Sequence, residues 1–198
     1  MKKLFVCAAL AATAFVPSAA AAQAIPPAVI AVADLERVTS QCNACKTASA
    51  ALRSQVTNLQ NRQKALRAPL ETEAKSIQAA IDALKGANPD AALQARVRSF
   101  QTKQQSAQTE LARGEQTIQR NQAYIQKQIA DKLGPIYQQV MQRRGANVLL
   151  ETGSTLAAAN SVDISNDVLA ALNTALPRVA TIAPAAPAQP PQQQPQGR

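Results

Sequence analysis

The residues best suited to chemistry in this chain are Cys42 and Cys45, which two residues separate. Cysteines at this spacing can form a redox dithiol, half of a zinc site, part of a haem attachment site or a local disulfide. Zinc would need two further ligands, and haem attachment would need a histidine where Lys46 stands. In an oxidising compartment we expect a structural disulfide that pins the start of a helix. A reduced, silent pair and a redox role are the alternatives.

The composition argues against an enzyme. The 198 residues include no histidine and no tryptophan, only 3% are aromatic, and much of the 46% hydrophobic content is alanine. The lack of histidine excludes Ser-His and Cys-His nucleophile pairs and the HExxH zinc site. The sequence has no GxxxxGK[ST] motif for a nucleotide. We therefore predict no catalysis, no cofactor and no metal, and long helices as the main structure.

The amino terminus has the three parts of a bacterial secretory signal peptide. Met1-Lys2-Lys3 is basic, residues 4–16 are an apolar run of 13 residues, and Ala22-Gln23-Ala24 is an A-x-A cleavage site. A membrane anchor would need roughly 20 apolar residues. The sequence therefore predicts a signal peptide over residues 1–24, cleaved after Ala22 or Ala24, and a mature protein in the periplasm.

Residues 42–144 are predicted to form a helical hairpin with its turn at residues 86–90. Apolar residues recur at steps of three, four or their sum on both sides of Gly86-Ala87-Asn88-Pro89-Asp90. In an antiparallel pair of helices, facing residues have position numbers with a constant sum, and seven apolar pairs add to 177. These pairs are Leu84–Leu93, Ile77–Phe100, Leu70–Ala107, Leu66–Leu111, Leu59–Ile118, Leu52–Ile125 and Ala48–Ile129. The pattern predicts an antiparallel coiled coil with arms of roughly 40 residues, in preference to a compact bundle.

The segments that flank the hairpin predict a small body with β-structure, so the fold class is α+β. Residues 25–41 contain a β-branched run that predicts a first strand. Residues 145–180 contain two candidate strands, at 146–151 and 155–159, and a last helix capped by Ser165. Three short strands are too few to be stable alone, so we expect the body to close by association with copies of itself. Residues 181–198 are rich in Pro and Gln and predict a disordered tail, with contact to a partner as the alternative.

Positive charge is concentrated in the predicted hairpin. Residues 42–144 hold 16 Lys and Arg against 7 Asp and Glu, a net charge of +9, while the rest of the mature chain carries −2. A secreted protein rarely meets nucleic acid, so phospholipid headgroups, lipopolysaccharide and acidic polypeptides are the expected anionic partners. The alternative is that these cations only solvate a coiled coil. The candidate contact residues towards the tip are Arg62, Lys64, Arg67, Lys75, Lys85, Arg96, Arg98 and Lys103.

The layout resembles the Skp (OmpH-like) periplasmic chaperones. The similarity is carried by residues 147–151, by Asp163-Ile164-Ser165-Asn166-Asp167-Val168-Leu169, which is similar to the family's D-I-T-x-D-V-L ending, and by residues 29–34. The resemblance implies a jellyfish-shaped homotrimer, with a shared β-barrel body and three helical arms around a cavity. It also implies ATP-independent holding of unfolded outer-membrane proteins.

The residues of the hairpin are compatible with that activity. Its apolar stripe is interrupted by Gln63, Glu73 and Gln104, so the stripe offers apolar surface that is too dilute for self-aggregation. Two other classes remain open. One is a structural or adaptor protein of the envelope built on a coiled-coil hairpin, and the other is a redox protein that uses Cys42 and Cys45.

Overall fold

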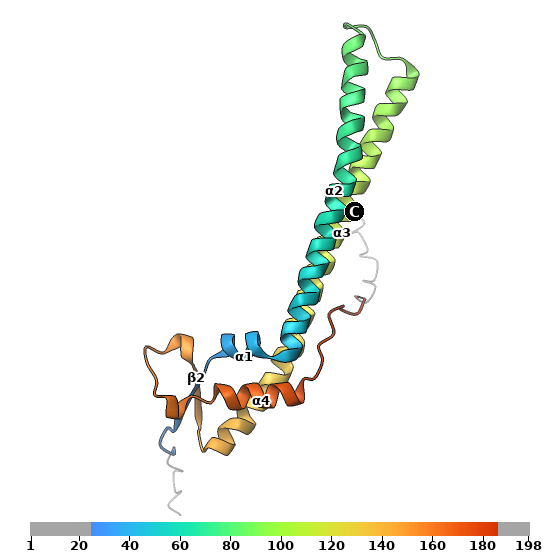
Figure 1. Cartoon of the computed structure of the whole chain (residues 1–198). Helices are drawn as coiled ribbons and strands as arrows, with labels where there is room; N and C mark the ends of the chain where they lie inside the picture. The colour runs from blue at the N-terminus through green and yellow to red at the C-terminus, as the bar shows by residue number, and fades with distance from the viewer. Residues whose placement is uncertain (1–24, 186–198) are drawn as a thin grey trace, which may run out of the picture.

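The computed structural model describes residues 25–185 and shows a two-helix hairpin that rises from a small base (Figure 1). The predicted signal peptide and residues 186–198 of the predicted tail lie outside the described residues. The elements, in chain order, are β1 (Ile30–Ala33), α1 (Leu35–Gln41), α2 (Asn43–Ala83), α3 (Ala91–Arg144), β2 (Val148–Glu151), the 3-10 turns η1 (Thr152–Ser154) and η2 (Asn160–Val162), and α4 (Ser165–Ala175). The chain is mostly helical, with one small sheet.

Helices α2 and α3 form the hairpin, with 41 and 54 residues respectively. Residues 84–90, which include the predicted turn, join them. Asp90 caps α3, because its side chain accepts a hydrogen bond of 2.7 Å from the Leu93 amide. Gly145 ends α3 with a φ of 68°, a left-handed conformation that glycine adopts without steric cost.

Side-chain contacts define the register of the two arms. Arg62 contacts Glu110, Lys103 contacts Glu73, and Asn121 contacts Gln55. The numbers in these pairs add to between 172 and 176, so the arms are antiparallel. Their register differs from the predicted sum of 177 by at most five residues, which is about one and a half helical turns. Gly114 faces Leu59 so closely that a Cβ on residue 114 would lie 2.5 Å from Leu59 Cδ1. A glycine at this point therefore lets the two helices approach.

The sheet has two strands, and the predicted third strand at 155–159 is wrong. β1 and β2 are parallel, with Ile30 opposite Val148. Residues 155–159 are a loop between η1 and η2, while Asp163 makes an isolated bridge to Val32. The predicted strand failed because its three alanines have low β-propensity and because Leu156, its one large apolar residue, points entirely into solvent.

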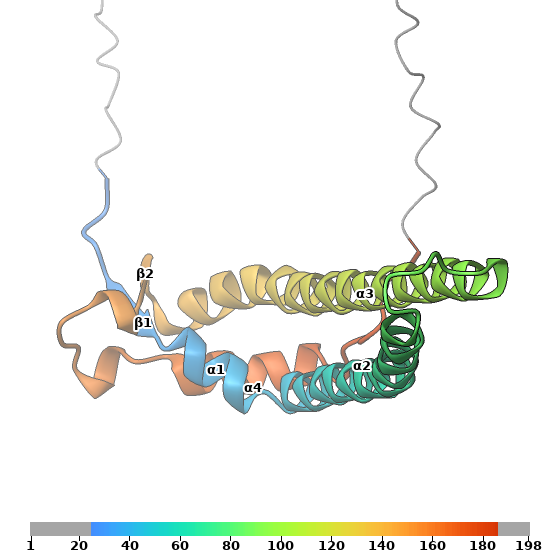
Figure 2. The same ribbon diagram turned by 90° about the horizontal axis from the view of Figure 1, so that it is seen from above.

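The core of the molecule lies in the base. Helix α4 packs against α3, and helix α1, which was not predicted from the sequence, packs against α4 and α2, as the view from above shows (Figure 2). Val38 of α1, Val140 of α3, and Val168 and Leu172 of α4 are fully buried. The lower end of the hairpin is therefore part of a packed core.

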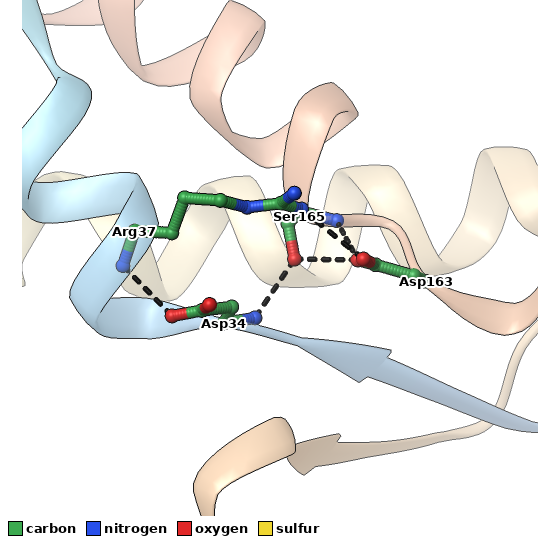
Figure 3. A network of polar contacts seen from close by, with 4 residues as sticks. All are labelled: Asp34, Arg37, Asp163 and Ser165. Atoms are coloured by element: carbon green, nitrogen blue, oxygen red, sulfur yellow. Dashed lines mark hydrogen bonds and ion pairs between the residues drawn. The ribbon is translucent and has the colours of Figure 1, made fainter. Parts of the chain in front are cut away.

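A polar network joins the first strand to the last helix (Figure 3). The Asp34 amide donates to Ser165 Oγ at 2.8 Å, and the Ser165 hydroxyl donates to Asp163 at 2.5 Å. The Arg37 guanidinium also donates to Asp163, at 3.1 Å. Asp34 caps α1 by accepting from the Arg37 amide at 2.7 Å. The network thus joins Asp34 to Asp163 and Ser165, which belong to two of the segments that carry the family resemblance.

The network also corrects the predicted cap of α4. Ser165 is the first residue of α4, and its side chain binds Asp34 and Asp163 instead of capping the helix. Burial alone would raise the pKa of Asp163. The hydrogen bonds from Ser165 and the Arg37 charge outweigh that effect and hold the pKa of Asp163 below its usual value. Asp163 is therefore ionised and acts as the acceptor at the centre of the network.

Candidate functional site

An apolar groove runs along the outer half of the hairpin between α2 and α3. One section, of about 330 Å³, is lined by apolar residues and by Gln63, Arg67, Glu71, Gln104 and Gln108. A second section, of about 300 Å³, continues it towards the base. The apolar lining of the first section is Leu66, Leu70, Ala74, Phe100, Ala107 and Leu111, most of it half-buried. The paired stripes of the two helices thus cover each other only in part.

Several of the predicted contact cations are held in ion pairs on the arms. Arg62 binds Glu110 across the hairpin with an N–O distance of 2.5 Å, and Lys103 binds Glu73 at 2.7 Å. Hydrogen bonding to Arg62 lowers the pKa of Glu110, and Glu110 raises the pKa of Arg62. Arg67 pairs with Glu71 one turn along α2. Arg62 and Lys103 therefore link the two arms, whereas the pair of Arg67 lies within α2.

The other five predicted cations are spread along the outer arms. The Arg96 guanidinium donates to Ser76 Oγ at 2.8 Å. Within residues 25–185, no acidic side chain forms an ion pair with the remaining four, which are Lys64, Lys75, Lys85 and Arg98. Residues 62–113 carry nine Lys and Arg against five Asp and Glu, and the lower hairpin carries seven against two. The structure thus distributes positive charge along the whole hairpin and does not gather it in one patch.

The two cysteines lie where the base meets the hairpin. Cys42 and Cys45 form a disulfide and are both buried. Cys42 is also the N-cap of α2, because its sulfur accepts from the Cys45 amide. The amide of Asn43, the residue after Cys42, donates to Asn173 Oδ1 of α4 at 2.9 Å. The first turn of α2 is therefore fixed to the base by this hydrogen bond and by the burial of both cysteines. Among the described residues, no group of three or more His, Cys, Asp and Glu side chains is placed to hold a metal.

Three amide side chains on the lower hairpin form a site that was not predicted from the sequence. Gln55 of α2 and Asn121 and Gln128 of α3 all bind the chain that follows α4. Asn121 is only 4% exposed although it is polar. It lies three residues after Ile118 and four before Ile125, so it occupies the apolar stripe of α3. A polar residue on this stripe was the signal that could have identified the group.

A second apolar surface lies beside the sheet. A furrow of about 370 Å³ is lined by Ala33, Leu35, Tyr137, Met141, Leu149 and Leu150, among others. Burial raises the pKa of Tyr137, and the charge of Glu151 raises it further. Leu150 and Ile30 of the two strands are 40% and 47% exposed. No helix within residues 25–185 has the length and apolar character needed to cross a membrane.

Comparison with known proteins gives the relationship of the chain. The family model described as "Outer membrane protein (OmpH-like)" matches residues 29–172, which include both strands, the whole hairpin and most of α4. No curated protein matches the sequence. The structure is similar to a crystal structure from Caulobacter crescentus CB15, described as an OmpH-like outer membrane chaperone, with a TM-score of 0.65 and 22% identity over 78% of this chain and 90% of that chain. The two proteins share a fold, and this chain belongs to the OmpH-like family of outer membrane proteins.

Proposed function

We propose that this protein is an ATP-independent periplasmic holdase, which binds unfolded outer-membrane β-barrel proteins between helical arms and prevents their aggregation. The observation that carries the proposal is the half-covered apolar groove along a basic hairpin, in a chain of the OmpH-like family. A structural neighbour described as an outer membrane chaperone supports the same role. The predicted signal peptide supports the compartment.

The groove suits transient capture of unfolded chains. Its apolar residues are half-buried, so each of them gains only part of a full burial energy when a client side chain covers it. Several such weak contacts along one arm bind a long client firmly in sum, while each contact exchanges quickly. A groove of this kind holds a client and requires no nucleotide to release it.

Positive charge on the arms adds an electrostatic part to capture. Lys64, Lys75, Lys85 and Arg98 are exposed and outside the ion pairs of the arms, so they are the proposed first contacts for acidic clients or for anionic phospholipid and lipopolysaccharide. Arg62, Arg67, Arg96 and Lys103 have a second, structural role. Because salt screens exposed charges over about 8–10 Å, raising the salt concentration should slow capture of an acidic client.

The base supports assembly into a homotrimer. A sheet of two short strands is marginal by itself, and the furrow between β2, α1 and α3 leaves apolar side chains half-covered. Copies of the chain that pair at this surface would cover it and extend the sheet. A mass measurement in dilute solution tests this proposal, because monomer alone would contradict it.

We also propose a structural role for the cysteine pair. The Cys42–Cys45 disulfide lies among buried residues of the base, and the same turn of α2 is tied to Asn173. Alkylation of the unfolded protein before and after reduction reports the oxidation state. A pair that stays reduced in periplasmic preparations would contradict the role.

An aggregation assay tests the holdase directly. The mature protein is mixed with an unfolded outer-membrane β-barrel protein without nucleotide, and light scattering is followed. We expect the scattering to be suppressed. A variant with Leu70→Gln and Leu111→Gln in the groove should protect several-fold less, because the groove loses apolar surface. Leu156→Gln is the matched control, since Leu156 is fully exposed on a loop of the base. Equal loss in the control would remove the groove from the proposal.

A further inference from the structure

The chain continues past α4 as a segment that lies along the lower hairpin. Residues 177–185, here called the strap, contain no helix or strand and run beside α2 and α3 (Figure 1). Gln128 makes two bonds to Ala180, donating to its carbonyl at 2.8 Å and accepting from its amide at 3.0 Å. Gln55 donates to the Thr181 carbonyl at 3.1 Å, and the Ala183 amide donates to Asn121 at 2.8 Å. All four bonds use main-chain atoms of the strap.

The three amide side chains form one unit, here called the amide cradle. The Asn121 amide group donates to Gln55 Oε1 at 2.8 Å, which joins the two helices under the strap. Asn121 is almost fully buried, and leaving its polar atoms unpaired would be costly. A main chain lying across the cradle satisfies both its donors and its acceptors. The cradle thus presents a matched set of hydrogen-bonding groups to a polypeptide backbone.

The burial pattern of the strap is that of an extended chain. Val179 is buried, and Thr181 and Ala183 are half-buried, while Ala180 and Ile182 are exposed. Alternation with a period of two is typical of extended backbone. Apart from Val179 the inward side chains are small, so the hydrogen bonds depend little on side-chain identity. Any extended segment with small or apolar residues at alternate positions has the features that the cradle binds.

We propose that the amide cradle is a binding site for extended polypeptide, which the strap occupies in the free protein and an extended client segment occupies in the complex. This inference rests on the proposed holdase function. Strands of outer-membrane β-barrels are extended and place successive side chains on opposite sides, and the strap shows the same alternation in the burial of its residues. Because the strap must leave before a client enters, the apparent affinity for the client equals its affinity for the open cradle multiplied by the fraction of molecules in which the cradle is open.

Hydrogen exchange on the full mature chain tests whether a client displaces the strap. Exchange is followed by mass spectrometry on peptides that cover residues 176–185, with and without an unfolded outer-membrane β-barrel protein. We expect client binding to raise exchange in the strap by roughly tenfold, because the amides of Ala180 and Ala183 lose their acceptors. Peptides around Val38 and Val168 in the core should not change. If the client is captured and the strap stays equally protected, the holdase function stands and the inference about the cradle is overturned. If no client is captured, the proposed function itself fails.

Substitutions in the strap separate release of the strap from binding of the client, because they leave the side chains of the cradle unchanged. Ala180→Pro removes the amide that Gln128 accepts from, so the strap should exchange faster and client affinity should rise several-fold. Ile182→Pro is the matched control, because no acceptor is found for the Ile182 amide within the part of the chain that the structure describes. Adding Gln128→Glu to Ala180→Pro should lower client affinity again, because the side chain loses its donor. A freed strap with unchanged client affinity would show that the cradle only fastens the strap.

Discussion

The base and the outer arms use the same kinds of apolar residue but cover them to different degrees. In the base, Val38, Val140, Val168 and Leu172 are completely buried. In the outer arms, residues 62–113, the buried apolar residues are Ile77 and Ala107, and the leucines of the groove are half-exposed. The base is therefore held by packing, whereas the arms depend on long helices, one narrow seam and ion pairs. The groove, which is proposed to bind clients without displacing any part of the chain, is thus only half-covered in the free protein.

The strongest test of this division removes the outer arms. Deleting residues 62–113 joins Asn61 to Gly114, and the numbers of these residues add to 175, within the range of the observed contacts. We expect most of the protection of a client in the light-scattering assay to be lost, because the groove is absent and only the amide cradle of the lower hairpin remains. The base should still assemble, as judged by circular dichroism and mass in solution. Full protection by the shortened protein would place the client site in the part that it keeps, which is the base and the lower hairpin with the cradle.

Equal truncations in the two regions should have unequal effects on stability. Leu172→Ala should lower the free energy of unfolding by about 3 kcal/mol, because it opens a cavity in a packed core. Leu70→Ala should cost about 1 kcal/mol, since its side chain is half-exposed before the change. Denaturant unfolding at one fixed protein concentration measures both values. Similar losses for the two variants would mean that the arm is packed as tightly as the base.

The polar network predicts a pH dependence that is confined to the base. The pKa of Asp163 is lower in the folded than in the unfolded chain. Its stabilisation is therefore fully present above about pH 4 and is lost as the pH falls through the folded pKa. Asp163→Asn should cost about 1–3 kcal/mol at pH 7, from the weakened bonds to Arg37 and Ser165. The difference from the natural protein should shrink in acid.

An exposed carboxylate on the arm provides the control for this measurement. Asp131 pairs only with Lys127, one turn away on the surface of α3, in the described part of the chain. Asp131→Asn should change stability by less than about 0.5 kcal/mol at either pH. If both variants lose the same stability, the network of Figure 3 contributes no more than a surface pair.

The smallest predicted effect concerns the close approach of the arms. Gly114→Ala should gain up to about 1 kcal/mol of helix propensity, but the new Cβ collides with Leu59 Cδ1. We expect a net loss of less than about 1 kcal/mol in denaturant unfolding. In a Leu59→Ala background the collision is absent, so Gly114→Ala should stabilise the protein. The same effect in both backgrounds would show that the contact does not limit the spacing of the helices.

The hairpin was predictable because its signals are local and repeated. Steps of three, four or their sum along two stretches and a turn around Pro89 both act within a few residues. Helix α1 was missed because its seven residues are mostly polar, and its position depends on Asp34 and on contacts with α4. The third strand was predicted from a turn and a short apolar run, but three alanines bury too little surface to hold a strand on the sheet.

The groove, like the hairpin, could be predicted from local sequence signals, whereas the cradle could not. The apolar residues that line the groove, Ala74 apart, were on the predicted stripes, because one helix period defines both. Gln55, Asn121 and Gln128 become one group only when the strap from beyond α4 returns to the hairpin. Likewise, the cations were identified from composition, but their pairing with Glu73 and Glu110 depends on the register across two helices.

The parallel pairing of β1 and β2 has a consequence for how the chain reaches its fold. Ile30 pairs with Val148, so the two strands are 118 positions apart in the sequence. Closing so long a loop directly is slow, because its entropy must be lost before any contact forms. A hairpin that zips from its turn at residues 84–90 replaces this search with a series of neighbouring contacts and delivers its two ends to one place. We therefore expect the hairpin to speed the pairing of the two strands. Shortening both of its helices by the same length should leave the rate of sheet formation unchanged or increase it.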